Sequence, residues 1–116
     1  MLLRLKEQPE GEVDHENLAI MFATLNALHA REVLGSYIQD PAQIERAAES
    51  LSFDFGMMFD DSVIEMGGKR YRPRVCFVSD DGTVMPGAAE FDFLHEYSLG
   101  QFDNLDDVEI IEGHQA

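Results

Sequence analysis

The stretch QDPAQ, residues 39–43, decides the fold, because it holds the signals for both the end of one helix and the start of another. Asp40 is suited to cap a helix N-terminus, and Pro41 falls at the first helical position, where its missing N–H costs no hydrogen bond. Gln43 stands three residues after Asp40 and completes a capping box. The stretch therefore predicts two helices joined as a hairpin, with a cap worth about 1 kcal/mol.

Before this stretch, apolar residues recur at helical spacing and predict a first helix that begins after Asp14. One apolar stripe consists of Leu18, Met21, Phe22, Leu25 and Leu28. A second stripe, on nearly the opposite side, consists of Ile20, Ala27, Leu34 and Ile38. Because both faces are apolar, we expect this helix either to lie at the centre of the fold or to form a homodimer contact.

After this stretch, a second helix is predicted by apolar residues at spacings of four and three. They form a continuous seam suited to packing on the first helix: Ile44, Ala48, Leu51, Phe55 and Met58. The run FDFGMMF at residues 53–59 could also form an apolar groove for a partner, but a stripe at this spacing is more often part of a core.

Beyond Asp61 the pattern changes to short strands. We expect a strand at 62–66, a glycine-rich turn at 67–70, and a buried strand at Val75–Val78. Asp81-Gly82 is a hairpin turn signal, and Pro86 confines the return strand to an edge or cuts it short near Met85. Further extended segments are expected at 2–5 and 108–111, whereas residues 90–102 fit a strand or a short helix. The sequence thus predicts one α+β domain spanning 1–116, with an N-terminal helical hairpin packed on a small antiparallel sheet, a meander.

Negative charge is concentrated in the last third of the chain. The net charge is −15, and all eight Lys and Arg residues fall within residues 1–74. Residues 75–116 contain ten carboxylates and no Lys or Arg. Such a surface repels phosphate and anionic lipid, so we expect no direct binding to nucleic acid or membrane, and we expect basic partners to be attracted.

Apolar content and length indicate a soluble protein. No run of 18 uncharged apolar residues occurs, and Met1–Lys6 is too short for a signal peptide, so a cytoplasmic location is expected, in a bacterial host if the chain is phage-encoded. Cys76 is the single cysteine and stands among apolar neighbours, which predicts a buried, inert thiol.

Motifs for catalysis, cofactors or metals are not evident. The four histidines lack the H-E-x-x-H spacing, and the acidic segments lack the order of a calcium loop, so neither metals nor cofactors are expected. We therefore do not expect an enzyme; the least unfavourable catalytic site would be His95 with Asp92 and Glu96. The run KRYRPR at 69–74 could grip phosphate, although pairing with the protein's own carboxylates is the simpler interpretation.

The carboxylates of the last third are the candidate partner-binding residues. On strands and helices, neighbouring carboxylates on one side would lie roughly 6 Å apart, and rows at that spacing approximate a strip of DNA phosphates. Solubility alone is the competing explanation of this acidity. The candidate positions are Asp80, Asp81, Glu90, Asp92, Glu96, Asp103, Asp106, Asp107, Glu109 and Glu112.

In size, acidity and α+β pattern the chain resembles small phage and mobile-element inhibitors of host nucleic-acid machinery, among them anti-CRISPR and anti-restriction proteins. That resemblance is one of composition and transfers no residue roles. It implies an inhibitor that occludes the basic surface of a nucleic-acid-binding protein. The alternatives are an acidic chaperone or immunity-type protein that binds a partner through the apolar FGMMF region and, less favoured, a small enzyme.

Overall fold

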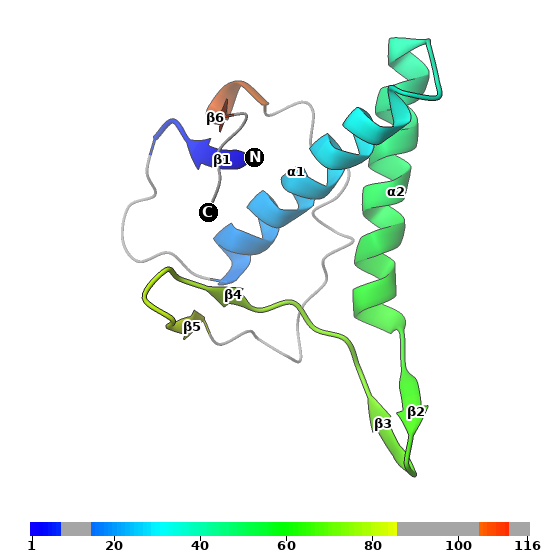
Figure 1. Ribbon diagram of the computed structural model, residues 1–116, viewed down its shortest axis with the longest axis vertical. Helices are drawn as coiled ribbons and strands as arrows, with labels where there is room; N and C mark the ends of the chain where they lie inside the picture. The colour runs from blue at the N-terminus through cyan, green and yellow to red at the C-terminus, as the bar shows by residue number, and fades with distance from the viewer. Residues whose placement is uncertain (8–14, 86–104, 112–116) are drawn as a thin grey trace.

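In the part of the chain that the structure describes, the protein is an α+β fold with two long helices and three pairs of short antiparallel strands (Figure 1). The computed structural model describes residues 1–7, 15–85 and 105–111. It confirms the predicted fold class and the helical hairpin. Asp14, after which the first helix was expected to begin, and the segment 90–102 lie outside the described residues.

Helix α1 (His15–Leu34) and helix α2 (Pro41–Asp61) meet at the predicted cap. The Asp40 carboxylate accepts a hydrogen bond of 3.1 Å from the Ala42 N–H, and Pro41 is the first residue of α2. Within the described part of the chain Gln43 makes no return bond to Asp40, so the cap is half of the expected box. At the other end, the Ser62 N–H donates to the Met58 carbonyl.

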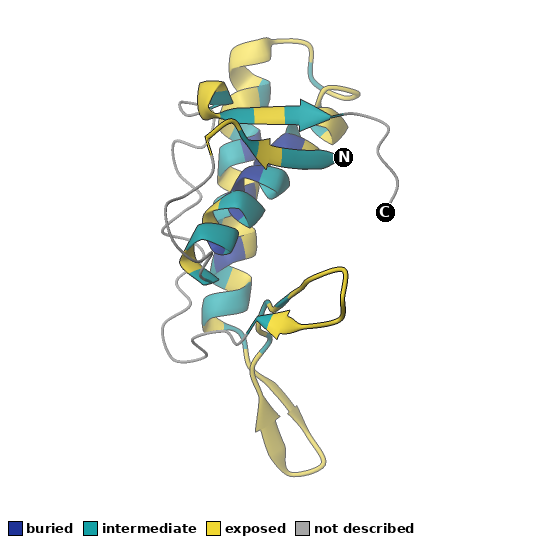
Figure 2. Ribbon diagram, turned by 90° about the vertical axis from the view of Figure 1, so that its left-hand side faces the viewer, coloured by how far each residue is buried: buried dark blue, intermediate teal, exposed yellow. Residues whose placement is uncertain are grey.

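Small side chains form the contact between the two helices. Helix α1 contributes Ala19, Ala23 and Ala27, and α2 contributes Ala48, Ser52 and Gly56, all buried. The buried Ser52 hydroxyl donates to the Ala23 carbonyl over 3.2 Å. Both sets repeat every four residues, a pattern whose ridges interlock with the helices inclined by about 50°. Figure 1 shows this oblique crossing, and Figure 2 shows the buried residues where the helices meet.

The prediction that the large apolar side chains of α2 pack on α1 is therefore wrong. Ala48 lies in the contact as expected, but Leu51, Phe55 and Met58 are exposed. Small residues let the helix backbones approach closely, so the contact follows the small-residue stripe, and the large side chains lie beside it. On α1, likewise, Ala27 is buried by this contact, whereas Ile20 is exposed.

The strands form three separate two-stranded pairs among the described residues, where one meander sheet was expected. Strand β1 (Leu2–Leu5) pairs with β6 (Val108–Ile111), which places Leu2 opposite Ile111. Strand β2 (Ile64–Met66) pairs with β3 (Lys69–Tyr71). The turn between β2 and β3 needs Gly67 and Gly68, because both have positive φ angles, of 62° and 77°.

The third pair, β4 (Phe77–Val78) and β5 (Val84–Met85), is the hairpin predicted around Asp81-Gly82. Its loop is one residue longer than predicted, because Gly82 donates to the Ser79 carbonyl and takes a φ of 89°. Val75–Val78 is not a buried strand: Cys76 and Val78 are exposed, because a two-stranded ribbon covers α1 with only one of its faces.

Aromatic side chains join this ribbon to both helices. The Phe22 ring of α1 lies 6.1 Å from Phe77 and 6.4 Å from Phe59 of α2, both edge to face. His15 lies 5.3 Å from Phe77, and its Nε2 bonds the Val75 carbonyl over 3.3 Å. Helix α1 is thus the central element, with α2 on one side and β4 on another.

Candidate functional site

Five of the ten predicted partner-binding carboxylates lie in the described part of the chain, and all five are exposed. They form two groups, each on a different pair of strands. Asp106, Asp107 and Glu109 belong to the β1–β6 pair, and Asp80 and Asp81 form the tip of the β4–β5 hairpin. The other five fall outside the described residues: Glu90, Asp92, Glu96, Asp103 and Glu112.

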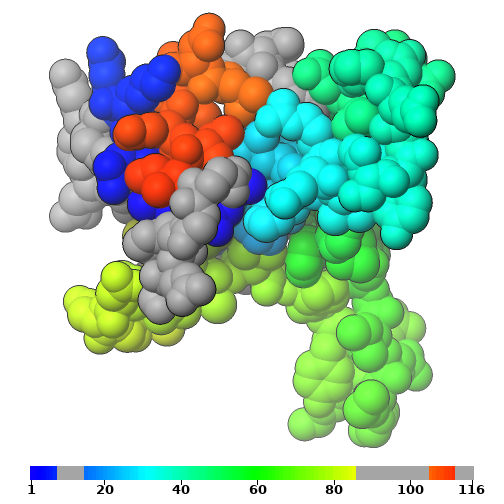
Figure 3. Space-filling model, turned by 45° about the horizontal axis from the view of Figure 1, so that its top comes forward, coloured from blue at the N-terminus to red at the C-terminus, as the bar shows by residue number. Residues whose placement is uncertain are grey.

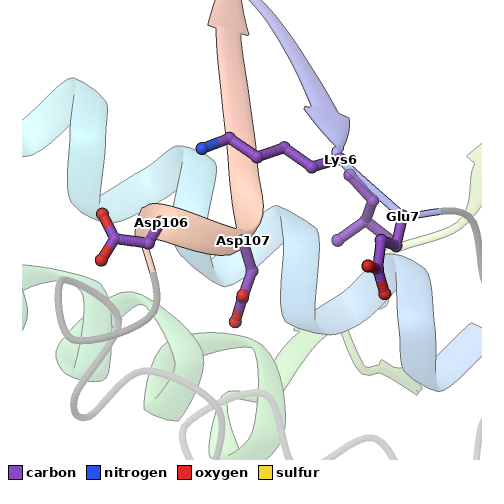
Figure 4. A pocket seen from close by; sticks show the side chains of 5 residues that line it. Lys6, Glu7, Asp106 and Asp107 are labelled. Atoms are coloured by element: carbon purple, nitrogen blue, oxygen red, sulfur yellow. The ribbon is translucent and has the colours of Figure 1, made fainter.

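The β1–β6 group includes a carboxylate that was not predicted from the sequence. Glu7 lies beside Asp106 and Asp107 along a cavity of about 410 Å³, and the Lys6 N–H donates to the Asp107 carbonyl over 3.0 Å. In Figure 4 the Asp107 and Glu7 carboxylates point to the same side, while the Lys6 side chain runs the other way across β6. The backbone pairing thus brings together carboxylates that are a hundred residues apart in sequence.

Only one of the five predicted carboxylates has a cationic partner among the described residues. Arg4 stands opposite Glu109 in the β1–β6 register, and its guanidinium lies 3.9 Å from the Glu109 carboxylate. Both side chains are about half exposed, so this pair contributes little stability. For the other four, the described residues place no Lys or Arg side chain within 4.0 Å: Asp80, Asp81, Asp106 and Asp107.

The hairpin group is organised by hydrogen bonds to Asp81. The Ser79 hydroxyl and the Thr83 N–H both donate to its Oδ1, the latter over 2.9 Å. These donors, the Ser79 hydroxyl first, lower the pKa of Asp81 from 3.8 to about 2. The Asp81 side chain is therefore held in one orientation and stays ionised at any pH above about 4.

We expect the β4–β5 turn to loosen in acid. Because the folded-state pKa of Asp81 is depressed, its stabilisation is present above pH 3.8 and is lost as the pH falls through about 2. An NMR titration of the Asp81 carboxyl carbon should give a midpoint near 2 in the native chain. In Ser79→Ala, which removes the leading donor, the midpoint should move toward 3.8. A native midpoint already at 3.8 would contradict this assignment.

The two acidic groups lie at different positions along α1 and do not form one continuous acidic surface. The β4–β5 hairpin lines a cavity with Leu18, whereas Ile110 of β6 lines another with Leu28 and Arg31. Ten helical residues separate Leu18 from Leu28, which corresponds to about 15 Å along the axis. In Figure 1 both strand pairs lie on the side of α1 away from α2, and Figure 3 shows them as separate lobes.

The cationic run at 69–74 pairs with the protein's own carboxylates at one position. Arg70 stands opposite Glu65 in the β2–β3 register, and its Nε lies 3.3 Å from the Glu65 carboxylate. Arg74 donates to the carbonyls of Phe59 and Pro73 over 2.9 and 2.8 Å. For Lys69 and Arg72, the described part of the chain offers no carboxylate within 4.0 Å.

The chemistry-bearing side chains give no organised reaction centre in the part of the chain that is described. Cys76 is exposed, which corrects the prediction of a buried thiol. Within residues 1–7, 15–85 and 105–111 no three His, Cys, Asp or Glu side chains gather in a way that could hold a metal ion. The weak catalytic candidate of His95, Asp92 and Glu96 lies outside these ranges. No described helix has the length and apolar character needed to cross a membrane.

Comparison of the chain with protein-family models, with curated proteins and with solved structures gave no match.

Proposed function

We propose that this chain is a non-catalytic inhibitor that binds the basic surface of a nucleic-acid-binding protein and occludes it. The observation that carries the proposal is the placement of Asp80, Asp81, Asp106 and Asp107, all exposed and without a cationic partner in the described residues. A protein surface that normally meets phosphates presents Lys and Arg side chains. Those side chains can pair with carboxylates as well as with phosphate oxygens.

The two groups suit this role because their backbones are fixed by strand pairing. Asp107 accepts the Lys6 N–H through its carbonyl, and Asp81 is held by Ser79 and Thr83. Carboxylates that are already positioned lose less conformational entropy on binding than those on free loops. The two groups lie on separate strand pairs, which lets them contact separate cationic clusters of one partner.

The test begins with capture of binding proteins from a lysate of the native host, with washes at low and then high salt. We expect a nucleic-acid-binding protein that is retained at low salt, released at high salt and displaced by DNA or RNA. Identification by mass spectrometry then allows affinities to be measured with purified partner. A partner that stays bound at high salt would instead favour the chaperone or immunity-type alternative.

Matched variants locate the binding surface. Asp106→Asn/Asp107→Asn and Asp80→Asn/Asp81→Asn should each weaken binding about tenfold, equal to roughly 1.4 kcal/mol. Glu45→Gln/Glu49→Gln removes the same charge from α2, outside both acidic groups, and should change affinity little. Equal losses in the site variants and the control would mean that total charge, and not this surface, sets the affinity.

A further inference from the structure

The β2–β3 hairpin is an arm on whose faces no other described element packs. Every residue from Val63 to Arg72 is exposed, and each strand packs mainly against the other. Figures 1 and 2 show the arm extending beyond the C-terminal end of α2, clear of the other elements. A two-stranded hairpin alone in water is at best marginally stable, so a surface that covers the arm would stabilise it.

One face of the arm is apolar. The register pairs Ile64 with Tyr71 and Met66 with Lys69, which places these four side chains on the same face. Ile64, Met66 and Tyr71 are 53%, 70% and 53% exposed. The opposite face carries Glu65 and Arg70, which pair with each other. The apolar face therefore bears one uncompensated cation, Lys69, at its edge.

A complementary surface lies on α2. Leu51, Phe55 and Met58 form a stripe with exposures of 41%, 49% and 44%. Beside it is an apolar cavity of about 280 Å³, lined by Leu51, Phe55 and Val33 among others. Asp54 and Asp61 follow Leu51 and Met58 by three residues, so helical geometry puts both carboxylates along one border of the stripe. The stripe is thus apolar with an acidic edge.

The arm cannot reach the stripe of its own chain. Val63 begins only two residues after α2 ends, and the Arg74 bond to the Phe59 carbonyl fixes the base of the arm to the end of that helix. Both constraints keep the arm directed away from Leu51 and Phe55. The arm and the α2 stripe are nevertheless complementary in charge. Residues 64–74 carry four cations and one carboxylate in a chain of net charge −15, whereas the border of the stripe is acidic.

We propose that two copies of this chain form a dimer in which the β2–β3 arm of each copy docks on the α2 stripe of the other. A twofold axis near the junction of α2 and β2 would place each arm alongside the partner's α2, since the arm continues in the helix direction. The dimensions agree: Ile64 to Met66 spans about 6.6 Å, and Leu51 to Phe55 about 6 Å. Lys69 then lies at the acidic border that Asp54 provides.

This arrangement replaces the homodimer contact through α1 that the sequence suggested. The acidic groups of the candidate site are not part of this contact, which involves only the arm and the α2 stripe. The dimer would therefore present two copies of the acidic surface. Its existence does not depend on the proposed inhibitory function.

The test is sedimentation equilibrium of the full chain over a wide concentration range. The native chain should reach twice its mass of 13.1 kDa, with a dissociation constant that rises with salt. Ile64→Ser and Tyr71→Ser should each weaken the dimer at least about tenfold, since each contact occurs twice. Val84→Ser, an equivalent loss of exposed apolar surface on β5, should leave dimerisation unchanged.

Charge reversal tests the register. Lys69→Glu and Asp54→Lys should each weaken dimerisation about tenfold, and the double variant Lys69→Glu/Asp54→Lys should recover it. Far-UV circular dichroism must show native helix content in each variant, since both positions are exposed. A chain that stays monomeric at all concentrations would overturn the proposal. So would a dimer that the Ile64 and Tyr71 variants leave intact, or a double variant without recovery.

Discussion

Replacing Ala48 by Leu should separate the two helices and lower the free energy of unfolding by about 3 kcal/mol, at the upper end of the cost of overpacking. Ala48 has no exposed surface and lies in the small-residue contact with α1. An added isobutyl group has no space there unless the helix axes move apart. Urea unfolding followed by the helical circular dichroism signal measures the change.

Ala42→Leu is the matched control for this substitution. Ala42 lies in the first turn of the same helix but is exposed, so the same added carbons meet solvent. Its unfolding midpoint should stay near that of the native chain. If Ala48→Leu proved as stable as Ala42→Leu, the close approach of α1 and α2 described above would be incorrect.

Replacing Phe22 by Ala should cost about 2–3 kcal/mol, somewhat less than for a fully buried Phe because the ring is half-buried. The Phe22 ring contacts Phe59 of α2 and Phe77 of β4, so its loss removes contacts in two directions. We expect the β4–β5 hairpin to be affected most, because few other contacts hold it to α1. Amide hydrogen exchange should quicken at Ser79, whose N–H donates to the Thr83 carbonyl across the hairpin, more than in the helices.

Tyr37→Ala supplies the comparison for this loss. Tyr37 is 82% exposed in the link between the helices, and truncating it removes aromatic surface without breaking internal contacts. Its stability and exchange pattern should match the native chain. Uniform acceleration of exchange throughout Phe22→Ala would argue against a local role of the aromatic cluster.

Local signals predicted the elements of this fold well. Asp40 and Pro41 gave the helix boundary, and glycine in the turn sequences gave both hairpins, because caps and turns depend on a few adjacent residues. The contact between the helices was mispredicted because hydrophobicity favours large side chains, such as Leu51, over small ones. Close packing through Ala23 and Ser52 depends on how the surfaces of both helices fit together. The apolar pattern of a single helix carries no information about the surface of its partner.

The sequence predicted which type of side chain forms the candidate site, but not how those side chains are arranged. The sequence indicated exposed carboxylates, and Asp80, Asp81, Asp106, Asp107 and Glu109 are exposed. It did not indicate that β1 would supply Arg4, which pairs with Glu109, or that Glu7, which follows β1, would add to the group. An alternating strand pattern identifies a strand but not its partner, so a pairing across a hundred residues could not be inferred.

That long-range pairing also bears on how the chain folds. Joining Leu2 to Ile111 closes a loop of more than a hundred residues, whereas the β2–β3 turn closes one of fewer than ten. The difference in closure entropy is about 2 kcal/mol, so β1 and β6 should meet after the helical hairpin has shortened the distance between them. The Asp107 and Glu7 group therefore forms late in folding, and on unfolding it should be among the first parts lost.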